Sequence, residues 1–338
     1  KRKSIVDLLA NVAGGITSLT LALAGLGVWS LVWGSLVLMS LRCLGFIVVS
    51  PYFVWPEFSI AKSKHLLSFG ALITVDRLLW FFYSRADTGI IGKVLGPEAL
   101  GVYAVAMQIA SLPLQKVNSI LNEVAFPAFS RIQNDMDRVR DYLGKASRVV
   151  SFLAFPVFIG ISSVSPIFVD VILGDQWTEA VIPLATLACI MPLRMISNII
   201  TSTLQGIGRV GVSVGNLIYA SIIIPAGILF GTRWGLEGVC VAWLLGFPLV
   251  TIIEIIRSRR FVGMGLLDFG GIFTRPLLGS LIMWAGVYLV YMNLGRHSQS
   301  VTGLVVAVAA GAVIYFVFTM AFNRRNLKEA IDLASLNR

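Results

Sequence analysis

The sequence has 338 residues, of which 57% are hydrophobic and only 13% are charged, and its mean hydropathy is +0.85. A soluble domain needs a far more polar surface, so this composition indicates an integral membrane protein. The formal net charge of +10 does not indicate nucleic-acid binding, because the cations stand in short clusters between apolar runs and form no continuous basic face.

Apolar runs near or above the ~20 residues needed to cross about 30 Å of hydrocarbon recur along the whole chain. They comprise residues 5–24, 26–49, 66–95, 99–129, 149–171, 180–205, 210–230, 236–256, 273–292 and 301–322. The sequence therefore predicts an all-α integral membrane protein of about ten transmembrane helices. Gly and Pro residues interrupt several runs, which membrane helices tolerate when neighbouring helices satisfy the freed backbone groups.

Lys and Arg alternate from one connection to the next. Basic residues gather at 1–3, 62–64, 131–148, 209, 257–275 and 324–338, whereas the intervening connections hold few. Because cytoplasmic loops retain Lys and Arg, both ends are predicted to be cytoplasmic, with an even number of crossings between them. The chain starts with Lys and not Met, and its basic cluster directly precedes an apolar run, so we expect a fragment that lacks its N-terminal part.

Several ionisable residues fall inside the apolar runs, where a charge is costly and so points to function. In the third run, helical spacing places Arg77 on one face and Asp76 and Asp87 on the adjoining face; Arg85 lies in the same run. A polar stripe on the fourth run consists of Gln108, Ser111, Gln115, Asn118 and Asn122, and a neighbouring stripe consists of Lys116, Ser119 and Glu123. The sixth run repeats the pattern with Arg194, Asn198, Thr201 and Gln205.

These stripes are compatible with a polar seam that is packed shut or with a water-accessible cavity. The number of amide groups that need partners favours a cavity, and its cations slightly outnumber its carboxylates. Since the planar guanidinium of Arg donates two hydrogen bonds at once to phosphate, we expect an anionic cargo. The predicted cavity residues are Arg77, Arg85, Lys116, Arg194, Gln108, Gln115, Asn118, Asn122 and Asn198, and the candidates for ion coupling are Asp87 and Glu123.

Nothing in the sequence indicates catalysis or a cofactor. There are two histidines, neither of which lies near a carboxylate pair in an apolar run, and no HExxH, GxSxG or phosphate-binding glycine loop occurs. The cysteines Cys43, Cys189 and Cys240 lie in apolar runs without metal-binding spacing, so no metal site is expected. The eight tryptophans mostly lie near the ends of predicted spans, which favours an aromatic belt over sugar stacking.

Several motifs resemble a known family. Residues 87–103 read Asp-Thr-Gly-Ile-Ile-Gly-Lys-Val-Leu-Gly-Pro-Glu-Ala-Leu-Gly-Val-Tyr, followed by Pro113 and by Phe-Pro-Ala-Phe-Ser-Arg-Ile-Gln at 126–133. Shorter matches lie at 173–177, 205–209 and 235–239. This pattern resembles the Wzx-like polysaccharide-transport family, the lipid-linked oligosaccharide flippases of the multidrug/oligosaccharidyl-lipid/polysaccharide (MOP) superfamily.

The resemblance implies a fold of two six-helix lobes with two further C-terminal helices. Aligned in this way, the chain lacks the first four helices. Residues 1–50 are then the last two helices of the N-terminal lobe, 51–65 a cytoplasmic linker, 66–258 the C-terminal six-helix lobe, 259–322 the two appended helices and 323–338 a cytoplasmic tail.

The function that the resemblance implies is flipping of an undecaprenyl-diphosphate-linked oligosaccharide across the bacterial plasma (inner) membrane by alternating access, without catalysis. Expected partners are this lipid-linked oligosaccharide and membrane lipids, with the polysaccharide polymerase and export machinery as further candidates. Two alternatives stay open. A drug or cation antiporter of the same superfamily predicts a carboxylate-rich cavity, and a membrane-embedded glycan polymerase predicts a large outer loop.

Overall fold

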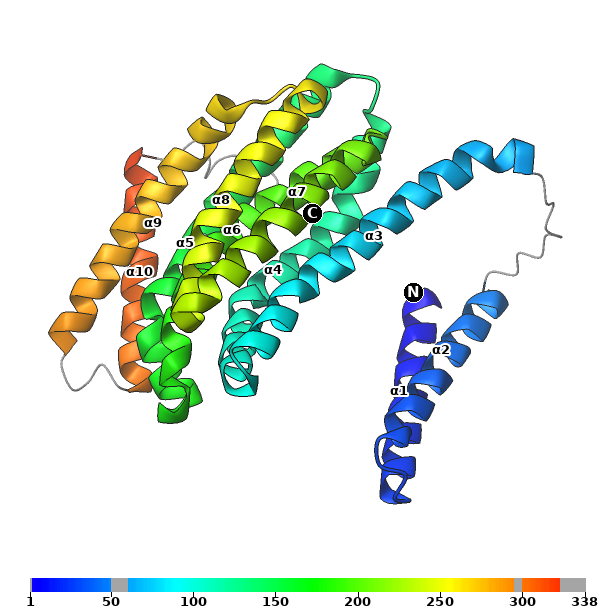
Figure 1. Ribbon diagram of the computed structural model, residues 1–338, viewed down its shortest axis with the longest axis horizontal. Helices are drawn as coiled ribbons and strands as arrows, with labels where there is room; N and C mark the ends of the chain where they lie inside the picture. The colour runs from blue at the N-terminus through cyan, green and yellow to red at the C-terminus, as the bar shows by residue number, and fades with distance from the viewer. Residues whose placement is uncertain (1, 50–59, 295–299, 323–338) are drawn as a thin grey trace. The chain divides into compact units, whose positions relative to one another are not determined.

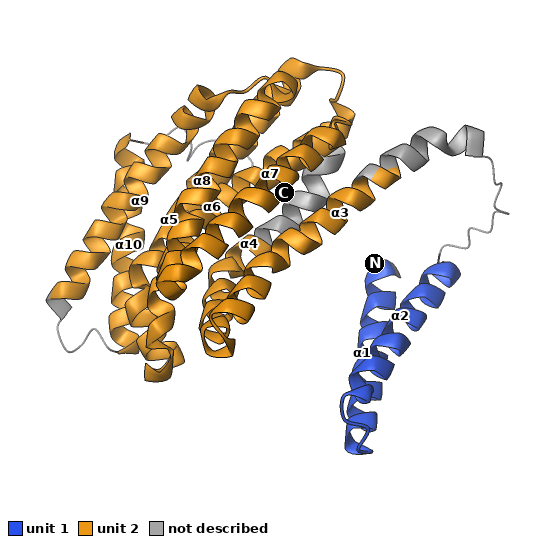
Figure 2. Cartoon of the chain, in the orientation of Figure 1, with its two compact units in different colours: residues 1–64 blue, residues 65–338 orange. Residues whose placement is uncertain are grey.

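The computed structural model describes residues 2–49, 60–294 and 300–322, and the side chains of these residues except 2, 60–69, 72, 116–127, 293 and 294. Residues 51–59 of the predicted linker and the predicted tail 323–338 lie outside the described residues. The chain forms two compact units, Lys1–Lys64 and His65–Arg338, which are coloured separately in Figure 2.

The first unit is a helical hairpin. Helix α1 spans Arg2–Leu23 and α2 spans Trp29–Val49, and Gly25 and Gly27 turn the chain between them with φ angles of 84° and 53°. Such left-handed backbone favours glycine. The helices pack closely, because a Cβ on Gly34 would collide with Ser18 of α1. Many large apolar side chains are exposed along both helices, as expected of helices in a bilayer.

The described residues of the second unit form eight long helices, which Figure 1 shows as a bundle; the first of them, α3, begins at Ile60, just before the unit boundary. Their bounds are α3 Ile60–Val94, α4 Pro97–Arg131, α5 Met136–Phe168, α6 Val181–Gly206, α7 Val210–Gly231, α8 Gly235–Val262, α9 Leu266–Leu294 and α10 Val301–Phe322. Short π and 3₁₀ turns at Val169–Leu173 (η1) and Asp175–Ala180 (η2) join α5 to α6, and Thr232–Trp234 (η3) joins α7 to α8. Helix α3 starts in the segment predicted as a linker, so residues 60–65 are helical.

The ten α-helices found among the described residues confirm the predicted all-α fold class. Within the described part of the chain, seven helical segments are long and apolar enough to cross a membrane, and one of them, Val210–Val262, contains both α7 and α8. Prolines lie inside several helices without ending them, among them Pro113, Pro156, Pro166, Pro192, Pro225, Pro248 and Pro276.

Helix α5 starts earlier than its apolar run at 149–171, in the basic connection predicted at 131–148. The Asp135 side chain accepts a hydrogen bond from the Arg138 backbone N–H at 3.1 Å and so caps the helix. Val139 and Leu143 are buried while the charged residues around them are exposed. An amphipathic segment at 136–148 therefore extends the helix beyond its membrane-spanning run.

Helix α6 forms the centre of the second unit and contacts α4, α5 and α8. Its apolar side chains, such as Leu184, Leu187 and Ile196, are fully buried. Helices α9 and α10 pack against each other and against α5. The hairpin of α7 and α8 is tighter, because a Cβ on either Gly231 or Gly238 would overlap the backbone of the other glycine. One face of α6 carries polar side chains, and this face points toward α3, α7 and α8.

Candidate functional site

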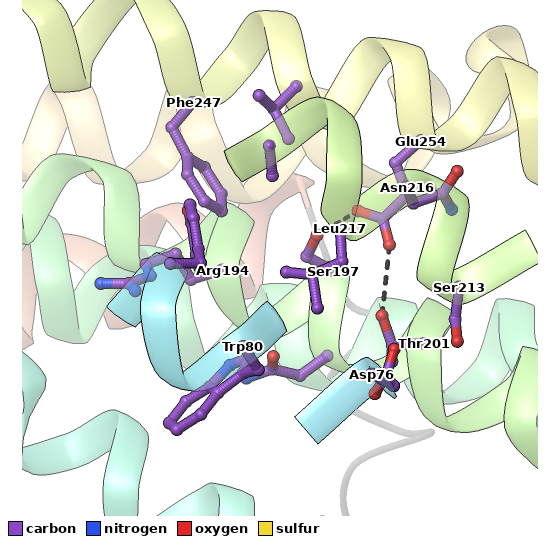
Figure 3. A pocket seen from close by; sticks show the side chains of 14 residues that line it. Asp76, Trp80, Arg194, Ser197, Thr201, Ser213, Asn216, Leu217, Phe247 and Glu254 are labelled. Carbon is purple, nitrogen blue, oxygen red and sulfur yellow. Dashed lines mark hydrogen bonds between the residues drawn. The ribbon is translucent and has the colours of Figure 1, made fainter. Parts of the chain in front are cut away.

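A hydrophilic cavity of about 150 Å³ lies inside the second unit, between α3, α6, α7 and α8 (Figure 3). Its ionisable lining residues are Asp76, Arg194 and Glu254. The other polar lining residues are Tyr83, Ser197, Asn198, Thr201, Ser213 and Asn216, and the apolar ones are Trp80, Leu217, Ala220, Phe247 and Val250. The cavity is thus a polar space within an apolar helix bundle.

The polar lining of α6 follows from helical geometry. Arg194, Ser197, Asn198 and Thr201 are spaced by three or four residues, or are direct neighbours, and so lie on one face of the helix. The remaining faces of α6 carry buried apolar residues that contact the neighbouring helices. Burial of those faces turns the polar face toward α3, α7 and α8.

Glu254 of α8 is a buried carboxylate whose residue is 4% exposed. Its two oxygens accept hydrogen bonds from the hydroxyls of Ser197 and, at 3.4 Å, Thr201, both on α6 (Figure 3). It forms no salt bridge with any residue that the structure describes. A buried charge is stable only when hydrogen bonds or a counter-ion compensate for lost hydration, so Glu254 depends on these hydroxyls and on whatever enters the cavity.

Both the nitrogen and the oxygen of the Asn216 side-chain amide, on α7, form hydrogen bonds with residues of α8. Its Nδ2 donates to the Ser258 hydroxyl at 3.2 Å, and its Oδ1 accepts from Arg257 Nε at 2.9 Å. The Arg257 guanidinium also lies over the Tyr219 ring, 4.7 Å from its centroid. These contacts orient Asn216 rigidly at one end of the cavity.

Arg194 lies against two aromatic rings of α8. Its guanidinium carbon is 5.3 Å from the ring centroid of Trp243 and 5.8 Å from that of Phe247, which is favourable cation–π geometry. Its Nη1 is 3.9 Å from the Met107 sulfur. Arg194 forms no salt bridge within the described part of the chain, so its guanidinium remains available to an anion.

A second polar network lies beside the cavity and joins three helices. The Trp243 indole N–H donates to the Tyr103 hydroxyl at 2.9 Å, and this hydroxyl donates to Asp87 Oδ2 at 2.7 Å. The Thr88 backbone N–H donates to Asp87 Oδ1 at 2.7 Å. Asp87 is 7% exposed and does not line the cavity. Through Trp243, this network also supports the ring on which Arg194 rests.

The structure brings only part of the predicted site together. Arg194 and Asn198 line the cavity, whereas Arg77 and Arg85 are exposed on α3 and do not. Gln108 and Gln115 are exposed on α4, where Gln115 Nε2 donates to the Ser111 hydroxyl at 3.0 Å. The other predicted residues, Lys116, Asn118, Asn122 and Glu123, belong to α4, but their side chains lie outside the described residues.

The charge of the described cavity differs from the slight cation excess that the stripes predict. One cation, Arg194, faces two carboxylates, Asp76 and Glu254. Sequence reasoning missed Glu254, although it lies in the predicted run 236–256 and the rule on ionisable residues in apolar runs would have found it. No group of three or more His, Cys, Asp or Glu residues that could hold a metal ion occurs among the described residues.

A bundle of apolar helices around a polar cavity defines the class of protein: a multi-pass α-helical membrane protein with an internal hydrophilic site. Residues 1–182 match the family described as "Polysaccharide biosynthesis protein", and the chain belongs to this family. The match confirms the resemblance to polysaccharide exporters seen in the sequence.

Named relatives agree with this membership. The chain is 32% identical to the lipopolysaccharide biosynthesis protein WzxC of Escherichia coli over 76% of this chain and 49% of the relative. It is 28% identical to the teichuronic acid biosynthesis protein TuaB of Bacillus subtilis, over 80% of this chain and 57% of the relative. It is 25% identical to the succinoglycan biosynthesis transport protein ExoT of Rhizobium meliloti, over 99% of this chain and 68% of the relative. The chain thus spans about half the length of WzxC.

Among solved structures, the lipid II flippase MurJ in its inward closed conformation has a similar fold. The TM-score is 0.62 at 17% sequence identity, and the match covers 94% of this chain and 67% of MurJ. At this identity the similarity establishes the fold and nothing about the ligand. The shared fold agrees with the predicted all-α membrane fold.

Proposed function

We propose that this chain is part of a flippase that moves an undecaprenyl-diphosphate-linked oligosaccharide across the bacterial plasma membrane by alternating access, without changing it chemically. The observation that carries the proposal is the polar cavity, in which Arg194 has no carboxylate partner among the described residues. Such a cavity costs free energy within a bilayer, so its presence favours a polar cargo, and Arg194 offers a cation to an anionic group of that cargo. The names of the relatives, which concern polysaccharides and flippases, support this cargo.

In this proposal the cationic side chains attract the diphosphate. Arg194 does so from the cavity, and Arg77 and Arg85 do so from the exposed surface of α3. The amides of α4 and α6 receive sugar hydroxyls, and carboxylates couple the cycle to an ion gradient. The amides proposed to bind sugar hydroxyls are those of Gln108, Gln115, Asn118, Asn122 and Asn198. The carboxylates proposed for ion coupling are Asp87 and Glu123, and Lys116 is a further cation for the diphosphate.

Both ends of the chain are proposed to be cytoplasmic, on the alternation of Lys and Arg between connections. The predicted division into lobes, linker, appended helices and tail is retained as part of the proposal. Membrane lipids surround the protein, and the polymerase and export machinery of the same pathway are its proposed partners. The names of the relatives do not favour the antiporter and polymerase alternatives.

The test is flipping by the full-length protein in vesicles, measured as the appearance of lipid-linked oligosaccharide that a membrane-impermeant glycosidase can cleave. Neutralising the proposed phosphate ligands together (R77Q, R85Q and R194Q) should lower the rate at least about tenfold, because charge-assisted hydrogen bonds to phosphate are lost. The control is R233Q, because Arg233 lies over Phe230, away from the cavity. An unchanged rate in the triple variant, at equal protein in the vesicles, would reject the proposal.

Single cysteines test the orientation in whole cells. A cysteine at Arg138 is expected to react with impermeant thiol reagents only after the cells are broken, and one at Glu179 is expected to react in intact cells. The reverse pattern would refute the proposed topology.

A further inference from the structure

Trp80 lies where an aromatic belt does not explain it. Tryptophans of such a belt stand at the ends of spans, whereas Trp80 stands near the middle of the predicted run 66–95. The residue lines the hydrophilic cavity and is 58% exposed. In the view of Figure 3, its indole is drawn below Arg194 and to the left of Asp76. A large π surface therefore borders a space whose other walls are mostly polar.

The polar groups around Trp80 include both donors and acceptors. Arg194 supplies N–H donors, and Asp76 and Glu254 supply carboxylate oxygens. Each Glu254 oxygen accepts one hydrogen bond from α6, and a carboxylate has about four lone-pair sites, so it can accept more. A bare cation would be suited to the carboxylates but repelled by Arg194. A neutral ligand with several hydroxyls would satisfy both kinds of group.

Tyr83 gives an independent indication of a ligand. It also lines the cavity, and its hydroxyl oxygen is buried without a hydrogen-bond partner among the residues that the structure describes. Buried hydroxyls in proteins are nearly always hydrogen-bonded, because an unsatisfied one costs free energy. The missing partner of Tyr83 is therefore expected in the cavity itself.

The volume limits what can enter. At about 150 Å³ the cavity is smaller than pockets for drug-sized ligands, which span roughly 300–1,000 Å³. An oligosaccharide does not fit, but one sugar ring does. A pyranose ring presents C–H groups on one face, which suit the negative face of an indole, and hydroxyls around its rim, which suit carboxylates, amides and guanidinium groups.

We propose that this cavity is a subsite for a single sugar ring of the cargo, with Trp80 as its stacking platform and Asp76, Glu254 and Tyr83 as its hydrogen-bonding partners, next to the phosphate ligand Arg194. The proposal rests on the proposed flippase function and adds to it a residue that determines specificity. In this proposal, Trp80 is responsible for the higher affinity of the protein for a glycosylated lipid than for the same lipid without sugar.

The experiment measures this difference directly. Full-length protein in nanodiscs is titrated with undecaprenyl diphosphate and with the same lipid carrying one glucose, galactose or N-acetylglucosamine, in competition with a fluorescent lipid-linked oligosaccharide. The wild type should prefer at least one glycosylated lipid over the bare lipid. W80A should reduce this preference about five- to tenfold, since an aromatic contact is worth up to about one tenfold step in affinity, and W80F should keep most of it.

The matched control is W284A, because Trp284 of α9 stacks on Tyr288 and does not line the cavity. Binding of the bare lipid by each variant reports on folding, because the diphosphate is unchanged. If the wild type binds bare and glycosylated lipids equally, or if W80A keeps the preference, the sugar subsite is refuted while the flippase proposal stands. If the wild type binds none of these lipids, the flippase proposal fails and the subsite with it.

Discussion

The Tyr103 hydroxyl joins three helices, so its removal has a calculable effect on stability. It accepts from the Trp243 indole at 2.9 Å and donates to Asp87 at 2.7 Å. The variant Y103F keeps the ring in the core, where Tyr103 is 1% exposed, and deletes both hydrogen bonds. It leaves an indole N–H and a carboxylate oxygen buried with one partner fewer.

The stability lost on removing these hydrogen bonds depends on whether the unfolded chain lies in water or in the membrane. In water-soluble proteins a hydrogen bond to a charged group contributes about 1.5–3 kcal/mol to stability. In membrane proteins, interhelical hydrogen bonds average about 0.6 kcal/mol and reach about 1.7, because polar groups also find partners in the unfolded chain within the membrane. Since this pair is buried and one partner is a carboxylate, we expect a Tyr103–Asp87 coupling near the upper value, about 1.5 kcal/mol. With the loss of the Trp243 bond, Y103F should destabilise the protein by about 2 kcal/mol.

The assay is a double-mutant cycle of Y103F and D87A, with unfolding of the purified full-length protein followed in mixed micelles as the fraction of dodecyl sulfate rises. The control is Y142F, because Tyr142 is 52% exposed on α5 and should change the free energy of unfolding by less than about 0.5 kcal/mol. A coupling energy below about 0.3 kcal/mol would show that the network does not hold α3 to α4 and α8, and the reasoning would be wrong.

Three further predictions concern packing and charge. G238A should destabilise the protein by about 2–4 kcal/mol or prevent its accumulation, because the new Cβ would overlap the carbonyl of Gly231. Removing either partner of the 2.5 Å Arg42–Asp7 ion pair should lower the yield of membrane-inserted protein severalfold, and exchanging the two residues should restore it. E254Q keeps an acceptor for the α6 hydroxyls and should shift the free energy of unfolding by less than about 1 kcal/mol, whereas E254A should cost about 2–3 kcal/mol, by the same titration.

Each of these has a control and an outcome that contradicts it. G211A, on α7, adds a Cβ into open space and should be neutral or slightly stabilising, so equal losses in G211A and G238A would exclude the packing explanation. A charge exchange that inserts no better than the single variants would mean that the ion pair does not hold α1 to α2. Equal stability of E254A and E254Q would mean that the α6 hydroxyls find other partners.

Hydrophobic run length was enough to predict most of the fold. The run at 301–322 coincides with α10, and the run at 210–230 agrees with α7 to within one residue. These agreements have a simple cause: a backbone in hydrocarbon must satisfy its own hydrogen bonds, so a long apolar run can only be a helix. The helical extension of α5 to Met136 was not predicted, because residues 136–148 are amphipathic and lie outside the apolar run.

The polar stripe of α6 was also predictable, since it is the property of a single helix, and Arg194 and Asn198 do line the cavity. Which face of α3 points toward the cavity was not predictable. Asp76 and Arg77 are neighbours in sequence, and successive residues of a helix point about 100° apart, so only one of them can face α6. The packing places Asp76 in the cavity and leaves Arg77 exposed.

By itself, then, the sequence determined that this protein is a helical membrane protein with polar stripes along several of its helices, because these properties depend on the composition and period of single helices. Only the tertiary structure decided which stripes meet. It brought Trp80, Arg194 and Glu254 of three different helices around one small space, because rotation about each helix axis is set by contacts with other helices and is not encoded in any one of them.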